Sequence, residues 1–205
     1  MIQEYDIGVL CLLETHISGD RALGVARRIS LDKSFMMHAN GQVGGIWCML
    51  NSQLWQLEVM EHSSQYIHLK ILKGALSWFC IFVYASPRTQ GRVALWGDLR
   101  RLAGQINGPW HLMGEFNAVL RQHERVGGSV NACIRGDNAF KDFVNRYHLM
   151  DLGYTGAPFT WHRGNVFERL DRSLASYEWR ILFPNAALNH LNPLKSDHAP
   201  ILLRL

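Results

Sequence analysis

Near its end, the chain places a carboxylate and an imidazole side by side before an apolar strand. Ser196, Asp197 and His198 precede the apolar stretch 199–203, and Pro200 fixes the entry of the chain into it. A carboxylate beside an imidazole at the mouth of a strand can bind a metal ion and donate a proton to a phosphate oxygen. Such a triplet alone is more often a turn. It therefore gains weight only if other stretches supply partner groups.

Partner groups of suitable chemistry occur near the ends of other apolar stretches: Glu14, Tyr84, Glu115, Asn117 and Asp171. With Asp197 and His198 they make four carboxylates, an amide, a phenol and an imidazole. Mg²⁺ prefers carboxylate oxygen and keeps waters and substrate phosphates in its shell. None of the ten histidines has the spacing of a zinc motif. The set predicts a Mg²⁺ site, which would also accept Mn²⁺.

Each of these residues also has a simpler interpretation when it is taken alone. A single carboxylate is usually exposed, a single tyrosine is usually a strand aromatic, and an asparagine is often part of a turn. A single histidine is most often structural. The ordered set, and not any one residue, supports a site.

The first half of the chain predicts buried and antiparallel strands. The continuous apolar stretch 7–13 suits a strand buried on both faces, and residues 21–29 are compatible with a short helix. Four apolar or alternating stretches follow, with turns too short to hold helices, which predicts antiparallel pairing. They are residues 44–50, 54–60, 66–72 and 77–85.

The second half mixes helices with strands. Residues 91–106 predict a helix, with Arg92 off an apolar face made by Val93, Leu95, Trp96, Leu99, Leu102 and Ile106. The other expected elements are a strand at 110–113, a helix at 138–147, strands at 159–162 and 168–174, a short helix at 177–183 and the closing strand. About ten strands interrupted by helices predict an α/β (α+β) class, with two packed sheets flanked by helices.

Composition indicates a folded chain with a weak preference for polyanions. The 205 residues fit one domain, 1–205, with 48% hydrophobic and 19% charged residues and a net charge of +4. The four cysteines form no close pair in sequence, and no signal peptide or membrane-length apolar stretch is present. We therefore expect an intracellular protein with reduced cysteines, and we count the nucleus among its expected compartments.

The motifs, taken in order, resemble those of the endonuclease/exonuclease/phosphatase superfamily, a family of four-layer sandwiches. Within that superfamily the chain is most similar to the endonuclease domain of plant LINE-type (non-LTR) retrotransposons. The matching motifs are LLET (12–15), GGIW (44–47), VYASP (83–87), PWHLMGEFN (109–117), ERVGG (124–128), DLGY (151–154), FTW (159–161), RLDR (169–172) and SDH (196–198).

This resemblance implies a role for each candidate residue. Glu14 is expected to ligate the metal, and Asp197 to help hold it or its water shell. Tyr84 and Asn117 would contact the scissile phosphate, and Glu115 would orient or deprotonate the attacking water. His198 would hydrogen-bond a phosphate oxygen, with Asp171 fixing its tautomer.

The sequence departs from the family pattern at two points. Glu115 stands where the family has aspartate, and one extra methylene displaces a carboxylate by about 1.5 Å. Productive geometry tolerates roughly 0.5 Å. The family also begins with a strand ending in an asparagine near the metal, and residues 1–6 leave no room for it. We therefore expect an N-terminally truncated domain with weakened activity.

Three functions remain open at this point. The first is a Mg²⁺-dependent, DNA-nicking phosphodiester hydrolase of retroelement origin, monomeric, whose parent element carries a reverse transcriptase domain. The second is a catalytically inert remnant with weak or no nucleic-acid binding, and the third is a small-molecule phosphatase. Five loop arginines are candidate contacts to a DNA backbone, or else solvated surface residues: Arg121, Arg125, Arg135, Arg163 and Arg172.

Overall fold

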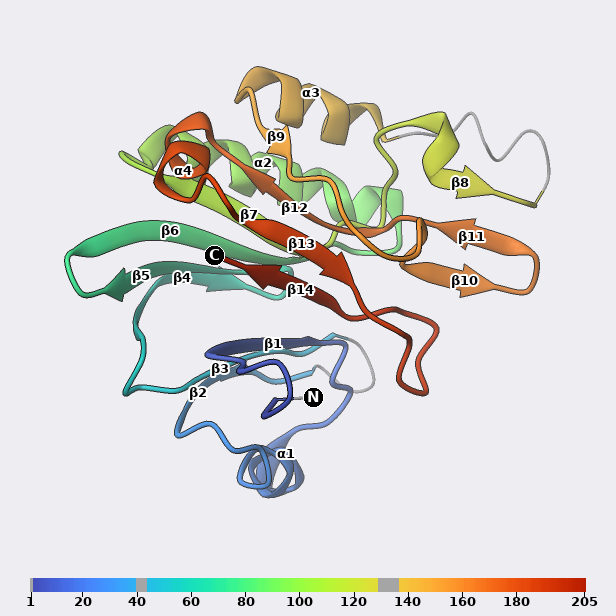
Figure 1. The fold of residues 1–205 in the computed structure, drawn as a ribbon. Coiled ribbons are helices and arrows are strands. Elements are labelled where there is room, and N and C mark those ends of the chain that lie inside the picture. Colours follow the sequence, from blue (N-terminus) through green and yellow to red (C-terminus); the bar gives the residue numbers. More distant parts are fainter. Residues whose placement is uncertain (1, 40–43, 129–136) are drawn as a thin grey trace. The chain divides into compact units, whose positions relative to one another are not determined.

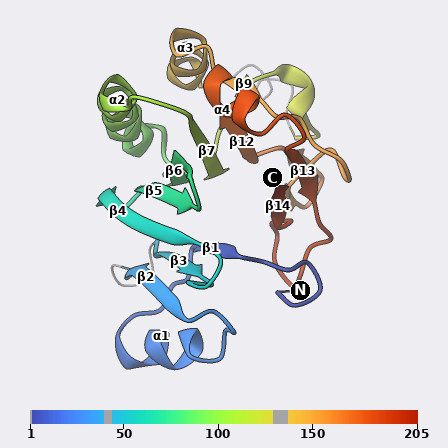
Figure 2. The ribbon, with the colours of Figure 1, turned by 60° about the vertical axis from the view of Figure 1, so that its left-hand side comes forward.

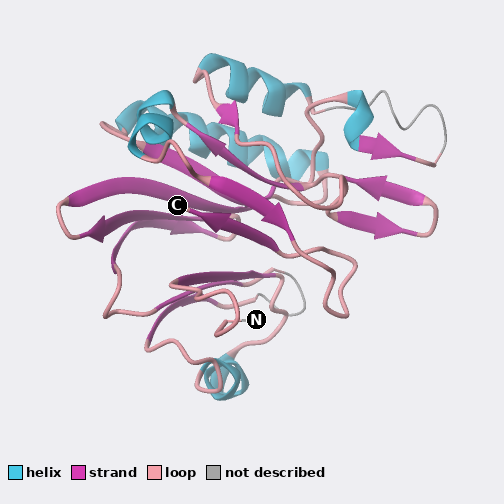
Figure 3. Ribbon diagram, in the orientation of Figure 1, coloured by secondary structure: helices cyan, strands magenta, loops and turns pink. Residues whose placement is uncertain are grey.

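A computed structural model describes residues 2–39, 44–128 and 137–205, which contain four α-helices and fourteen strands. The chain forms two compact units, Met1–Tyr84 and Ala85–Leu205. Figure 1 traces the elements in chain order and Figure 3 separates helices from strands. Cys133 and Arg135 lie outside the described residues. None of the described helices is long and apolar enough to cross a membrane.

The first unit contains a three-stranded antiparallel sheet in the order β1 (Val9–Leu13), β3 (Ile46–Leu50), β2 (Lys33–Met37). Every residue of β3 is buried, and alternate side chains of a strand point to opposite faces. Trp47 and Met49 therefore share one face, where they form a core cluster with Ala22 and Ala26. Those alanines belong to α1 (Gly19–Ala26), which lies over this face (Figure 2). The prediction missed β2, because it is short and half exposed.

The first unit also contains a meander of β4 (Gln56–Ser63), β5 (Tyr66–Lys73) and β6 (Leu76–Tyr84). Neighbouring strands pair antiparallel, as the short turns predict. Gly74, with φ of +59°, opens the two-residue turn between β5 and β6, a position that favours glycine. Tyr84, at the end of this meander, is buried.

The second unit contains the antiparallel sheet β7 (Trp110–Glu115), β12 (Asp171–Ala175), β9 (Met150–Asp151). Successive residues of β7 reach opposite faces of this sheet. Trp110 contacts Tyr147, just after α3 (Asn138–Arg146), whereas His111 contacts Trp179 of α4 (Tyr177–Leu182). Helices α3 and α4 therefore cover opposite faces of β7.

Shorter elements complete the second unit. The hairpin β10 (Trp161–Arg163) and β11 (Val166–Glu168) extends to β8 (Arg125–Val126). The strands β13 (Ala187–His190) and β14 (Ile201–Arg204) form a separate pair, and η1 (Gln122–Glu124) precedes β8. The single strand predicted at 168–174 is wrong, because the chain leaves the ladder at Arg169 and Leu170 between β11 and β12.

The long helix α2 (Thr89–Gln105) corrects the predicted apolar face at two positions. Leu95, Trp96, Leu99 and Leu102 are buried as predicted, but Val93 is 65% exposed and Arg92 is buried. Arg92 is buried because its Nε donates to Asp137 Oδ2 at 2.8 Å, just before α3. A counter-ion on a neighbouring element cannot be recognised from helical periodicity, which ranks arginine as a solvent-facing residue.

This correction predicts unequal effects of two substitutions on one helix. Leu95→Ala should lower the free energy of unfolding by about 2–5 kcal/mol, because it empties a fully buried site. Val93→Ala should change it by less than about 0.5 kcal/mol, because the side chain is largely exposed. Urea unfolding followed by circular dichroism measures both. A fall of more than about 2 kcal/mol in the free energy of unfolding of Val93→Ala, as for a core truncation, would support the predicted burial of Val93.

Candidate active site

The register of β7 against β12 places two carboxylates opposite each other. Glu115 is the last residue of β7 and Asp171 the first of β12, and the two are direct partners across the ladder. Partners of this kind project to the same face of a sheet. Both residues are buried. The strand pairing thus brings together two acids that are 56 positions apart in the sequence (171 − 115).

His198 bridges these two carboxylates. Its Nδ1 lies 2.9 Å from Asp171 Oδ2, and its Nε2 lies 3.6 Å from Glu115 Oε1. A β-bridge between Trp161 and His198 holds the backbone of the histidine. Asp171 accepts the Nδ1 proton, and so directs Nε2 toward the Glu115 side of the site.

The carboxylates determine the charge of His198. Partial burial lowers the pKa of this imidazole, but the hydrogen bond to Asp171 and the charges of Asp171, Glu115 and Asp197 outweigh it. The net effect raises its pKa to about 9. The ring is therefore a cation at neutral pH, able to donate a proton to an anionic oxygen.

Asn117 fastens the Glu115 side chain. Its Nδ2 donates to Glu115 Oε1 at 2.5 Å and to the backbone oxygen of Ala85 at 2.8 Å. An amide nitrogen carries two protons, so both are used within the protein. Asn117 adopts φ of +48°, a left-handed conformation that asparagine tolerates better than most residues. In this geometry Asn117 orients Glu115.

Asp197, predicted near the metal, is exposed and contacts Trp161. Its Oδ2 accepts from Trp161 Nε1 at 3.0 Å, and its backbone oxygen accepts from the His162 amide at 3.1 Å. Among the described residues, the acids and histidines whose ligand atoms all lie within 4.8 Å of one another are Glu115, Asp171 and His198. Neither Asp197 nor Glu14 belongs to that group.

Glu14 and Tyr84 meet each other in the first unit. The Tyr84 hydroxyl donates to Glu14 Oε1, and His16 Nε2 lies 4.0 Å from Glu14 Oε2. Glu14 and His16 both have positive φ, of +50° and +53°, which is uncommon for residues other than glycine. Strained backbone of this kind is concentrated at functional sites.

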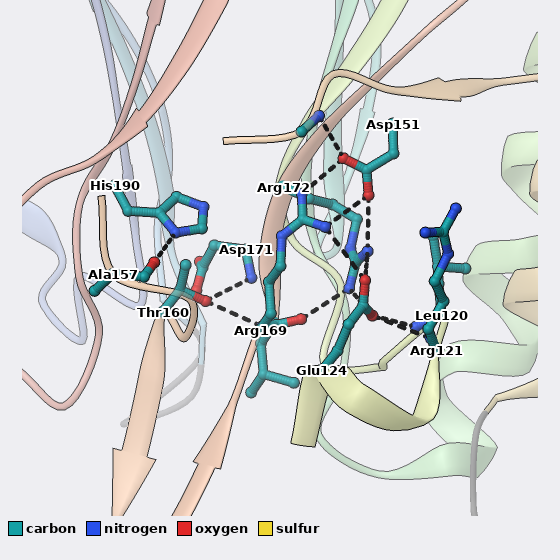
Figure 4. A network of polar contacts seen from close by, with 12 residues as sticks. Leu120, Arg121, Glu124, Asp151, Ala157, Thr160, Arg169, Asp171, Arg172 and His190 are labelled. Carbon is teal, nitrogen blue, oxygen red and sulfur yellow. Dashed lines mark hydrogen bonds and ion pairs between the residues drawn. The ribbon is translucent and has the colours of Figure 1, made fainter. Parts of the chain in front are cut away.

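A buried network of charges next to Asp171 was missed by the sequence analysis. Figure 4 shows Glu124 and Asp151 sharing the guanidinium groups of Arg169 and Arg172. Arg172 is fully buried, so its assignment as a candidate DNA contact is wrong. The signal available in the sequence was the run 169–172, in which arginines flank Leu170 and Asp171, but nothing in it identifies their partners.

The other candidate DNA contacts differ in their availability. Arg125 Nη1 donates to Glu168 Oε1 at 2.5 Å and is half-buried, whereas Arg121 and Arg163 are exposed. Exposed arginines suit contact with a phosphate backbone. Arg121 and Arg163 therefore remain candidate contacts.

The network shifts the pKa of its acids. Burial alone raises the pKa of Glu124, but the Arg172 guanidinium and the amides of Leu120 and Arg121 outweigh it and hold the pKa below its ordinary value. Burial also raises the pKa of the half-buried Asp151, but Arg169 and Arg172 outweigh it and hold that pKa below its ordinary value. Both acids are therefore anionic at neutral pH.

A shallow apolar cavity lies next to His198. It measures about 280 Å³, and its lining includes Phe159, Trp161, His162, Phe167 and Ala199. Trp161 is also the bridge partner of His198. Aromatic side chains beside such a histidine can stack on a nucleobase or a sugar.

Comparisons with known proteins support the fold. No protein-family model matches the chain, and a search of curated proteins found no match. An AP endonuclease from Archaeoglobus fulgidus has a similar structure, with TM-score 0.73 and 15% identity over 99% of this chain and 90% of that one. The 3′ phosphatase NExo from Neisseria gives TM-score 0.65 and 16% identity, over 99% and 90% of the two chains.

A retrotransposon enzyme is also among the similar structures. The endonuclease domain of TRAS1, a telomere-specific non-LTR retrotransposon, gives TM-score 0.63 and 12% identity over 83% of this chain and 76% of that one. The chain therefore has the endonuclease/exonuclease/phosphatase fold, and the fold class predicted from the motifs is confirmed.

The geometry of His198 predicts a pH dependence. Because its folded pKa of about 9 exceeds the ordinary 6.5, its stabilising effect is complete below pH 6.5 and is lost as pH rises through 9. The free energy of unfolding should fall across this window in EDTA, and Asp171→Asn should flatten the fall. An NMR titration of the ring checks the assignment. A ring that titrates at or below pH 6.5 would contradict this geometry.

Proposed function

We propose that the chain is a Mg²⁺-dependent phosphodiester hydrolase of retroelement origin that nicks DNA. The observation that supports this most is the arrangement of Asp171, His198 and Glu115, in which a cationic imidazole lies between two buried carboxylates. Cleavage of a phosphodiester by water depends chiefly on positioning and charge neutralisation. The His198 cation supplies charge neutralisation, and the oriented Glu115 carboxylate supplies the positioning of the water.

Each residue takes a distinct role in this proposal. Asp171 holds His198 through Nδ1, and His198 Nε2 donates to a phosphate oxygen. Glu115, oriented by Asn117, positions or deprotonates the attacking water. By resemblance, Tyr84 contacts the phosphate, and Glu14 and Asp197 hold the metal or its water shell.

The donor chemistry fits a hard divalent cation. Glu115 and Asp171 offer carboxylate oxygens within 4.8 Å of each other, and carboxylate oxygen is the donor that Mg²⁺ prefers. The protonated His198 beside them acts as a proton donor and not as a ligand. When bound, Mg²⁺ supplies charge neutralisation at the phosphate and acidifies coordinated water. Asp197 and Glu14 are the further acids that the resemblance assigns to it.

A DNA substrate is supported by the exposed side chains of the second unit. Arg121 and Arg163 are exposed cations, and Phe159, Trp161 and Phe167 line the apolar cavity. Basic and aromatic side chains together are typical of surfaces that bind nucleic acid. We further propose that the chain acts as a monomer, within an element that also encodes a reverse transcriptase domain, and reaches nuclear DNA.

One observation favours an inert remnant as the second candidate. Glu115 Oε1 lies 3.6 Å from His198 Nε2, the atom that must reach the phosphate. A carboxylate one methylene shorter would withdraw by about 1.5 Å. At 3.6 Å the two atoms are not hydrogen-bonded, but the Glu115 carboxylate attracts the proton that His198 would donate to the phosphate.

Nicking of a supercoiled plasmid tests the proposed function. The native chain should nick with Mg²⁺ and not with EDTA, and His198→Ala should lower the rate about 10²–10⁴-fold, the usual contribution of a general acid. His62→Ala is the matched control, because that histidine is exposed on β4 and lies against Phe35. Absence of Mg²⁺-dependent nicking by the folded native chain would contradict the proposal and favour the remnant.

Substitution of Glu115 tests the competition for His198. Glu115→Asp should raise the nicking rate, by up to about 10²-fold, because a misplacement near 1 Å can cost that much. Single-turnover rates at saturating DNA measure the effect. A rate that is unchanged or lower in Glu115→Asp would show that the longer side chain is suited to the site.

A further inference from the structure

Glu124 is a carboxylate with five donors directed at it. Its side chain is 4% exposed, and its Oε2 accepts from the amides of Leu120 and Arg121 at 2.7 and 3.2 Å. Arg172 donates to both oxygens, at 3.0 and 2.8 Å, and Arg169 adds a contact of 3.2 Å. Five donors around one buried group make a rigid anchor, because each fixes a different direction.

The two arginines depend on this anchor. The side chain of Arg172 is 0% exposed and that of Arg169 is 6% exposed, and Asp151 is the other acid that contacts them. A buried guanidinium without its counter-ion is strongly unfavourable, since its charge has lost its hydration. Removal of the Glu124 charge would leave two positive side chains with one negative partner.

The same arginines flank the segment that carries Asp171. Between β11 and β12 the chain leaves the regular ladder, and its backbone groups bond elsewhere. The Arg169 amide donates to the backbone oxygen of Glu124 at 2.9 Å, and the Phe116 amide donates to the Leu170 oxygen at 2.9 Å. The amides of Leu170 and Asp171 both donate to Thr160 Oγ1 at 3.0 Å.

These contacts connect Glu124 to Asp171 from both sides. The backbone of Arg169 is bound to Glu124 before Asp171, and the side chain of Arg172 is bound to it directly after Asp171. Arg172 Nη2 also donates to the Arg169 oxygen at 2.8 Å, which closes the loop on itself. Figure 4 shows Asp171 next to this cluster.

We propose that Glu124 is a positioning residue that sets the place of Asp171 relative to His198 and Glu115 through Arg169 and Arg172. Glu124 makes no contact of its own with the three site residues among its described hydrogen bonds and ion pairs. It acts by holding residues 169–172, of which Arg169 and Leu170 lie outside the ladder and Asp171 and Arg172 begin β12. This inference rests on the proposed function for its effect on rate, but not for its effect on the segment.

The test compares two buried carboxylates of the second unit. Glu124→Gln keeps the size of the side chain and removes its charge. Asp137→Asn is the matched control, since the Asp137 side chain is 6% exposed and is bonded to Arg92, to Trp96 and to the start of α3. Both variants should lose thermal stability. Asp151→Asn serves as a milder second variant on the network, should Glu124→Gln not fold.

Two readouts separate positioning from general destabilisation. The first is the single-turnover nicking rate with Mg²⁺, at saturating DNA and as a function of DNA concentration. Glu124→Gln should lower the saturating rate about 10–10²-fold, as a displacement near 1 Å would, with half-saturation within about twofold. Asp137→Asn should keep the rate of the native chain. The second readout is hydrogen–deuterium exchange of peptides covering 168–175 and 138–146.

Exchange should increase at 168–175 in Glu124→Gln and at 138–146 in Asp137→Asn. If the native chain does not nick, the proposed function fails, and exchange alone then decides the inference about Glu124. Faster exchange at 168–175 confined to network variants would support it. Equal exchange there in Glu124→Gln and the native chain would overturn it, as would rates that fall equally in Glu124→Gln and Asp137→Asn.

Discussion

The antiparallel register of β7 and β12 is the constraint on which the candidate site depends. It sets Glu115 opposite Asp171, so that one histidine can contact both. A shift of one residue would turn one acid to the other face of the sheet, because side chains alternate along a strand. The register is maintained at both ends of the pairing, by the Phe116 amide bonded to the Leu170 oxygen and by the Ser176 amide bonded to the Trp110 oxygen. The chemistry of the site thus follows from backbone pairing more than from any single side chain.

The predictions from sequence succeeded where local pattern determines structure. Apolar stretches and short turns were sufficient for β1, β3 and the meander of β4, β5 and β6, because period and turn length act over a few residues. The motifs also identified Glu14 with Tyr84, and Asp171 with His198, as residues of one site chemistry, and the structure brings each pair into contact. The strand at 168–174 failed because the break at Arg169 is caused by Glu124 and Thr160, residues of other elements. Arg92 and Arg172 were misplaced for the same reason, since their counter-ions are remote in sequence.

Two features of the site have opposite effects on proton donation by His198. The neighbouring carboxylates outweigh the effect of burial and keep His198 protonated, which suits an acid that meets a phosphate oxygen. The extra methylene of Glu115 places a second carboxylate 3.6 Å from Nε2, where it strengthens the same charge but attracts the proton that the substrate would accept. An aspartate at this position would separate the two effects. The Glu115–Asp171–His198 cluster is therefore assembled, in a geometry that restrains the histidine.

We propose that a divalent cation binds beside the Glu115–Asp171–His198 cluster. Addition of Mn²⁺ to the native chain, followed by NMR of the His198 ring, tests it most directly, because a paramagnetic ion broadens only nearby resonances. The account predicts that the ring signal disappears near one equivalent of Mn²⁺ and persists in the double variant Glu115→Gln, Asp171→Asn. A sharp His198 signal at excess Mn²⁺, or equal broadening in the double variant, would contradict it.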